Sequence, residues 1–226
     1  AMLLRQLRDN LTEYEDGLHL IALDMRSGPQ HRHSMIDTLP MVSAQDHEDW
    51  LNRLRGLPEQ LSQYQTLLSE GISRDRTQAQ IVMSRVPSQI ANLITDQASE
   101  SPFYRAFATM PEGIDLDTQS SLQSAAATVI DEQVNPALQA LLAFLESDYL
   151  PAARPPGIGA LPGGKQVYSR LAQHFTTTEL TPDEIHEIGL REVARIRGEM
   201  EAVIDTVGFE GDICLLYTSP SPRDRQ

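Results

Sequence analysis

The stretch that decides the fold, residues 149–200, reads YLPAARPPGIGALPGGKQVYSRLAQHFTTTELTPDEIHEIGLREVARIRGEM. It joins a proline- and glycine-rich segment to a strongly signalled helix. Thr181 is a favourable N-cap, Pro182 suits the first helical position, and Glu184 lies three residues after the cap. This is the sequence of a capping box, in which cap and glutamate satisfy each other's backbone donors. It predicts a helix from residue 182.

The residues after this start keep a helical spacing. Apolar side chains recur mostly at steps of three and four, at Ile185, Ile188, Ile196, Met200, Val203 and Val207. Such a stripe is typical of an amphipathic helix with one buried face. Gly208 supplies a C-terminal stop signal, so the helix is expected to cover residues 182–207.

The rest of the chain also has helical patterns. We expect helices over 2–23, after Ser43, after Pro58, from Thr77 with a kink or split at Pro87, over 117–149 with an interruption at Pro136, and over 165–174. The Gly56–Pro58 break predicts a helical hairpin, residues 26–40 read as an irregular connection, and the loop at 99–115 has aromatic anchors. No strand alternation and no internal repeat occurs. The predicted fold class is therefore all-α, a multi-helix array of long amphipathic helices with Pro/Gly-rich connections.

Composition excludes several function classes. The chain has 226 residues and a net charge of −14, with 40% hydrophobic and 5% aromatic residues. Acidic and basic side chains are interspersed, so no nucleic-acid partner is expected. No run approaches the roughly 18 apolar residues of a membrane span. The first residues, AMLLRQLRDN, lack the apolar core of a signal peptide, and Met2 behind Ala1 indicates an incomplete N-terminus, so no compartment is predicted.

Two histidine patterns were weighed as metal sites. His186 and Glu187 lie in HEIGL, which differs from a zinc-binding HExxH helix because Leu190 replaces the second histidine. One ligand is left, and both residues are explained as polar positions of a capped helix. His31 and His33 could reach a metal only if other ligands converged there, and a structural zinc normally takes four. We therefore predict no metal ligand and no catalytic residue in this chain.

A glycine turn is the remaining candidate for a binding role. Gly163 and Gly164 lie in LPGG before Lys165, without the spacing of a phosphate loop. Together with Arg154 and Tyr168 they could line a cleft for a peptide carboxylate. The alternative is a plain structural turn. The single cysteine, Cys214, has no activating neighbour, so nucleophilic catalysis is not expected.

Several spaced blocks carry a family resemblance. YLPAAR (149–154), LPGGKQVY (161–168), TTTELTPDEIHEIGLREVARIRGEME (176–201) and VGFEGD (207–212) resemble signatures of the bacterial domain of unknown function 885 family. DHEDWLNRLRGLP (46–58), GISRDRTQAQIVMSRVPSQI (71–90) and SPFYRAFATMP (101–111) are similar to it too. The resemblance covers about residues 4–213.

The resemblance implies an enzyme larger than this chain. The family is similar to the zincin metallopeptidases, with an HExxPGHH-type motif and an EGW-containing helix downstream of the VGF block. Neither motif occurs here, so zinc is expected in the full-length parent and no cofactor in this chain. The chain is then an N-terminal helical part, residues 1–213, whose partners are the missing C-terminal half and a peptide substrate. The alternative is a helical binding or scaffold module without chemistry.

The last residues, CLLYTSPSPRDRQ (214–226), depart from the family pattern. CLLYTSPSPRD resembles the read-through translation of a transposase-type sequencing adapter, which predicts that residues 214–224 are not natural protein. The alternative is a genuine disordered tail rich in Ser and Pro. If the parent is longer, helices that pack on its missing half should expose apolar faces, including that of residues 181–207.

Overall fold

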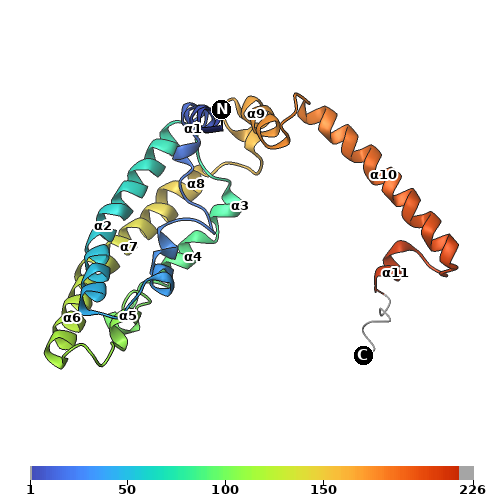
Figure 1. Ribbon diagram of the computed structural model, residues 1–226. Helices are drawn as coiled ribbons and strands as arrows, with labels where there is room; N and C mark the ends of the chain where they lie inside the picture. Colours follow the sequence, from blue (N-terminus) through green and yellow to red (C-terminus); the bar gives the residue numbers. More distant parts are fainter. Residues whose placement is uncertain (1, 219–226) are drawn as a thin grey trace. The chain divides into compact units, whose positions relative to one another are not determined.

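The computed structural model describes residues 2–218, and this part of the chain is helical with no β-strand (Figure 1). The α-helices are α1 (Met2–Glu15), α2 (Ala44–Ser73), α3 (Gln80–Met83), α4 (Val86–Ala91), α5 (Arg105–Ala108), α6 (Leu116–Val129), α7 (Asn135–Phe144), α8 (Leu150–Ala152), α9 (Gly164–Thr176), α10 (Pro182–Val207) and α11 (Ile213–Thr218). Short 3₁₀ helices are η1 (Leu18–Leu20), η2 (Pro29–Thr38), η3 (Ala98–Glu100) and η6 (Ile158–Ala160). The predicted all-α class is confirmed.

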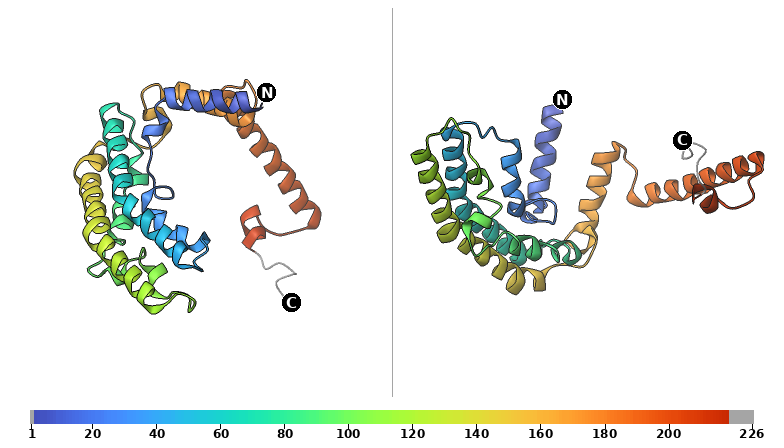
Figure 2. Two further views of the ribbon diagram at one scale, coloured as in Figure 1. Left: turned by 60° about the vertical axis from the view of Figure 1, so that its left-hand side comes forward. Right: turned by 90° about the horizontal axis from the view of Figure 1, so that it is seen from below.

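The chain divides into two compact units, Ala1–Gly164 and Lys165–Gln226. The hydrophobic core belongs to the first unit, where α2 lies alongside α6, η4 (Ile130–Val134) and α7 (Figures 1 and 2). Within the described residues, no helix is both long enough and apolar enough to cross a bilayer.

Helix α2 begins at the predicted cap and runs without a break to Ser73. Ser43 accepts from the Asp46 N–H, and the Asp46 carboxylate accepts from the Ser43 N–H, which completes a capping box. Hydrogen bonds from the Ser43 hydroxyl and then from the Ser43 N–H to the Asp46 carboxylate hold the pKa of Asp46 below its usual value. The buried face repeats along the whole helix through Trp50, Leu51, Leu54, Leu57, Leu61 and Leu68.

The predicted hairpin at Gly56–Pro58 was wrong, because Pro58 lies inside continuous α2. An internal proline costs about 3 kcal/mol, since it removes one hydrogen bond and crowds the preceding turn. Burying one leucine side chain contributes about 1.5–3 kcal/mol. Leu54, Leu57 and Leu61 flank the proline and are all buried in one core. Keeping these leucines on one face outweighs the cost of the proline.

Prolines do interrupt the second long helical segment. The predicted interruption at Pro136 is confirmed: α6 passes into a π-helical turn, η4, immediately before α7. A second π-helical turn, η5 (Leu145–Tyr149), precedes Pro151 in α8. A wider turn accommodates a proline ring that would clash with the preceding carbonyl. The segment therefore passes through two π-helical turns while Ile130, Val134 and Leu145 stay buried against the core.

The other predictions for the first unit are confirmed in part. The segment after Thr77 is split, with Pro87 in the first turn of α4, and Phe103 and Phe107 are buried as anchors of the loop at 99–115. The helix expected over 2–23 ends at Glu15, before Gly17 in the left-handed region at φ 72°. Residues 26–40 are more regular than expected, because Pro29–Thr38 within them form η2.

Helix α10 has the predicted ends. Thr181 and Glu184 form the capping box, and Gly208 closes the helix in the left-handed region at φ 63°. Its apolar stripe is largely exposed: Val203 is 61% exposed and Val207 is 64% exposed, whereas Ile204, outside the stripe, is buried. The exposed face expected for this helix is therefore present. Arg195 pairs with Glu192 and Glu199, and Arg197 pairs with Glu201.

Replacing Leu61 by alanine should destabilise the first unit by about 2–5 kcal/mol, because the side chain is 2% exposed in the core between α2 and its neighbours. The matched control is Leu116→Ala, the same chemical change at a residue that is 80% exposed. Urea unfolding followed by circular dichroism measures both. Equal midpoints for the two variants would contradict the packing of α2.

Candidate functional site

Arg154, a predicted cleft residue, is held by main-chain carbonyl groups. Its Nε donates to the Thr77 carbonyl at 2.8 Å, and one terminal nitrogen donates to the Pro155 and Gly157 carbonyls at 3.1 and 2.7 Å. Its backbone forms a parallel bridge with Ala79, with the Gln80 N–H donating to the Arg154 carbonyl. The arginine thus ties the segment after α8 to the segment before α3.

Tyr149 reinforces the same connection. Its hydroxyl oxygen accepts a hydrogen bond from the Gln78 N–H at 2.8 Å, and the side chain is fully buried. Burial raises the pKa of the Tyr149 hydroxyl, and burial also lowers the pKa of Arg154. Both pKa changes follow from partial shielding from water where the 77–80 and 149–157 segments meet.

The glycine turn is tight for a structural reason. Gly163 has φ 68°, and a Cβ on Gly164 would lie 2.0 Å from the Ile158 carbonyl oxygen. The turn is joined to the first unit by Arg76, which donates to the Pro162 carbonyl at 2.6 Å. Tyr168 belongs to the second unit and is 52% exposed. The contacts of Arg154 go to Thr77, Pro155 and Gly157, so the structure does not gather the predicted residues by direct hydrogen bonds.

The histidines weighed as ligands have other roles. His31 Nε2 lies 3.2 Å from the Met25 carbonyl oxygen, and His33 Nδ1 lies 3.0 Å from that of Gln30. His186 and Glu187 are exposed on α10. Within residues 2–218, no group of three or more His, Cys, Asp or Glu side chains is placed to hold a metal ion. These residues do not fit a zinc site.

A pocket that the sequence did not predict lies in the first unit between η2, α2 and the segment just before α5, which contributes Phe103. Its volume is about 280 Å³. Basic, apolar and amide side chains line it, from Arg32, Met35, Trp50, Arg53, Leu54, Gly56, Leu57, Gln60 and Phe103. We call it the Arg32–Trp50 pocket. Its residues come from three separated parts of the chain, so no local sequence motif predicts the pocket.

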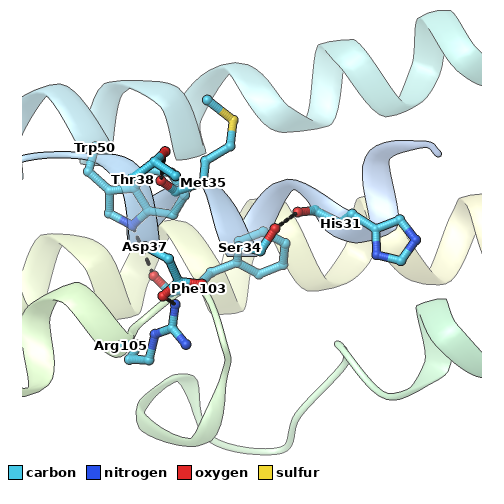
Figure 3. A network of polar contacts seen from close by, with 8 residues as sticks. All are labelled: His31, Ser34, Met35, Asp37, Thr38, Trp50, Phe103 and Arg105. Atoms are coloured by element: carbon cyan, nitrogen blue, oxygen red, sulfur yellow. Dashed lines mark hydrogen bonds and ion pairs between the residues drawn. The ribbon is translucent and has the colours of Figure 1, made fainter. Parts of the chain in front are cut away.

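Polar contacts fix the walls of the Arg32–Trp50 pocket (Figure 3). The Trp50 indole N–H donates to the Phe103 carbonyl at 3.1 Å, which joins α2 to the loop at 99–115. Arg105 pairs with Asp37 at 2.5 Å and so holds η2 to α5. Thr38 donates to the Met35 carbonyl at 2.9 Å within η2.

Comparison with known families decides where the chain belongs. The family described as bacterial protein of unknown function (DUF885) matches residues 1–225. The chain belongs to the DUF885 family. The match includes residues 214–225, and the suggestion that these residues are translated adapter stays a prediction. Cys214 to Thr218 lie in α11, and residues 219–226 lie outside the described part.

A solved structure shares the DUF885 chain's fold. The crystal structure of a "putative lipoprotein" from Colwellia psychrerythraea matches with a TM-score of 0.67 and 22% sequence identity. The match covers 83% of this chain and 34% of that chain, so this chain spans about a third of the protein it resembles. The search of curated proteins gives no match.

Replacing Arg154 by glutamine should destabilise this DUF885 chain by about 1–3 kcal/mol, because the carbonyl group of buried Thr77 loses a charged donor. Urea unfolding measures the change. The control is Arg53→Gln, which removes an exposed guanidinium on α2. An Arg154→Gln chain as stable as its parent would show that the junction does not depend on this side chain.

Proposed function

We propose that this chain is the N-terminal helical part of a bacterial zinc-dependent peptidase-like hydrolase, and that it forms a wall of the substrate cleft without supplying the metal site. The observation that carries the proposal is the exposed apolar stripe of α10 in a chain that aligns with about a third of a longer relative. An apolar stripe on a capped, ion-paired helix is typical of a face that other helices cover. The hydrolase itself is inferred from the resemblance of the family to zincin peptidases.

The residues proposed to line the cleft remain Arg154, Gly163, Gly164 and Tyr168. Gly163 exposes backbone at a tight turn, Gly164 is buried behind it against the Ile158 carbonyl group, and Tyr168 offers an exposed aromatic ring. Arg154 already donates to three carbonyl groups, so its role in the cleft would be to hold the 77–80 and 149–157 segments together rather than to bind the substrate directly. The proposed substrate is a peptide, bound together with the downstream half of the same protein.

A second candidate function is a helical binding or scaffold module without chemistry. It is favoured by the core of the first unit, in which α2 is already covered by α6, η4 and α7. Such a unit is able to act as a stable support in any larger protein. The two candidates differ in whether the full-length protein carries a working metal site.

The decisive experiment uses the full reading frame. If the proposal holds, the full-length protein should contain about one zinc ion per chain and should cleave fluorogenic peptides. A chelator should abolish the cleavage and added zinc should restore it. The 226-residue chain measured alongside should do neither.

A matched control replaces the first histidine of the downstream HExxPGHH-type motif by alanine in the full-length protein. This variant should lose zinc and cleavage while keeping its helical content. A full-length protein without the motif, or with peptide cleavage that is insensitive to chelators, would contradict the proposal. The first of these results would favour the scaffold.

A further inference from the structure

We propose that the Arg32–Trp50 pocket binds a small organic carboxylate that has a flat or aliphatic apolar body. The two guanidinium groups of Arg32 and Arg53 would take the carboxylate, and the apolar side chains would take the body. The proposal concerns only the first unit and does not rest on hydrolase activity in the full-length protein.

The first support is an unused donor. Arg32 Nε is buried and has no hydrogen-bond partner. A buried donor without a partner typically costs about 1–3 kcal/mol, and more when it is charged. No hydrogen bond or ion pair of Arg32 or Arg53 occurs within the described residues. A ligand carboxylate would bring a compensating negative charge to these two guanidinium groups, and arginine is suited to it because its planar fork matches two oxygens.

The charge of the lining points to the same ligand class. Among the described residues that form the pocket, two are basic and none is acidic. This contrasts with the chain as a whole, whose net charge is −14. The nearby carboxylate of Asp37 is already paired with Arg105 at 2.5 Å. An anion entering the pocket would therefore meet two positive groups without a competing carboxylate in the lining.

The apolar part of the lining selects against simple inorganic anions. Trp50, Leu54, Leu57, Phe103 and Met35 supply it. A strongly hydrated anion gains nothing from such a surface, whereas a hydrocarbon body gains roughly 25 cal/mol for each Å² that leaves water. Gln60 is left to bond a neutral polar group on the same ligand.

The size and rigidity of the pocket narrow the ligand further. A volume of about 280 Å³ lies just below the usual range of roughly 300–1,000 Å³ for sites of drug-sized ligands, which favours a small molecule. Trp50 is fixed by its hydrogen bond to Phe103, and the exposed Asp37–Arg105 pair links η2 to α5 (Figure 3). Fixed walls reduce the entropy lost on binding.

The chain supplies its own probe, since Trp50 is the only tryptophan. Tryptophan fluorescence is titrated with 3-phenylpropanoate, with its neutral isostere 3-phenylpropanamide, and with inorganic phosphate. The carboxylate should give a saturable change, and the amide and phosphate should bind at least about tenfold more weakly, because they lack either the charge or the apolar body.

Variants test the two arginines. Arg32→Gln and Arg53→Gln should each weaken 3-phenylpropanoate binding about tenfold or more. Arg55→Gln is the matched control, because Arg55 is an exposed arginine of the same helix that bonds Asn52 and does not line the pocket. It should bind the carboxylate as the unmodified chain does. Circular dichroism and urea midpoints check that each variant is folded. Because the Arg53 side chain is exposed, Arg53→Gln should fold and still tests the proposal if Arg32→Gln does not fold.

Three results would overturn the proposal. The first is the lack of a saturable fluorescence change with 3-phenylpropanoate at millimolar concentration. The second is equal binding of the carboxylate and the amide, or of the carboxylate and phosphate. The third is an equal loss of affinity in Arg55→Gln and in the folded pocket variants.

Discussion

The packing of one face of α2 against α6, η4 and α7 is the constraint on which the rest of the structure depends. This face runs from Trp50 to Leu68 and provides much of the buried core. It keeps α2 continuous through Pro58, and on the opposite segment it buries Ile130 at the start of the π-helical turn η4 and Leu138 after it. It also fixes Trp50, whose indole N–H holds the loop at Phe103. The Arg32–Trp50 pocket is built on that fixed point.

Four prolines in helical sequence show how burial decides local structure. Pro87 begins a short helix, Pro136 and Pro151 follow π-helical turns, and Pro58 leaves α2 continuous. Local preference is the same in each case, since every proline lacks a donor. The apolar side chains around Pro58 share one face and one core, which a short window of sequence does not reveal. The hairpin prediction failed for that reason, whereas the helix start after Ser43 and the capping box at Thr181 were predictable because they are local.

The two candidate sites also differ in whether local sequence reveals their residues. Arg154, Gly163 and Gly164 stood out because a glycine-rich stretch beside a cation is visible in sequence. The structure shows that carbonyl groups of residues distant in sequence, such as Thr77, already occupy the Arg154 donors. Arg32, Arg53 and Phe103 carried no common pattern, since a long-range contact through Trp50 brings them together. The absence of the second histidine at Leu190 was readable from sequence alone, because HExxH spacing is a local property.

The central claim is that the first unit holds its own core whereas the apolar stripe of α10 is a face for something else to cover. Amide hydrogen exchange on the 226-residue chain tests it most directly, because protection reports local opening. The account predicts that α2 amides on both sides of Pro58 exchange only with global unfolding, together with those of α6 and α7. It predicts that α10 amides exchange much faster, since an isolated helix is marginally stable. Protection of α10 equal to that of α2, or fast exchange around Pro58, would contradict it.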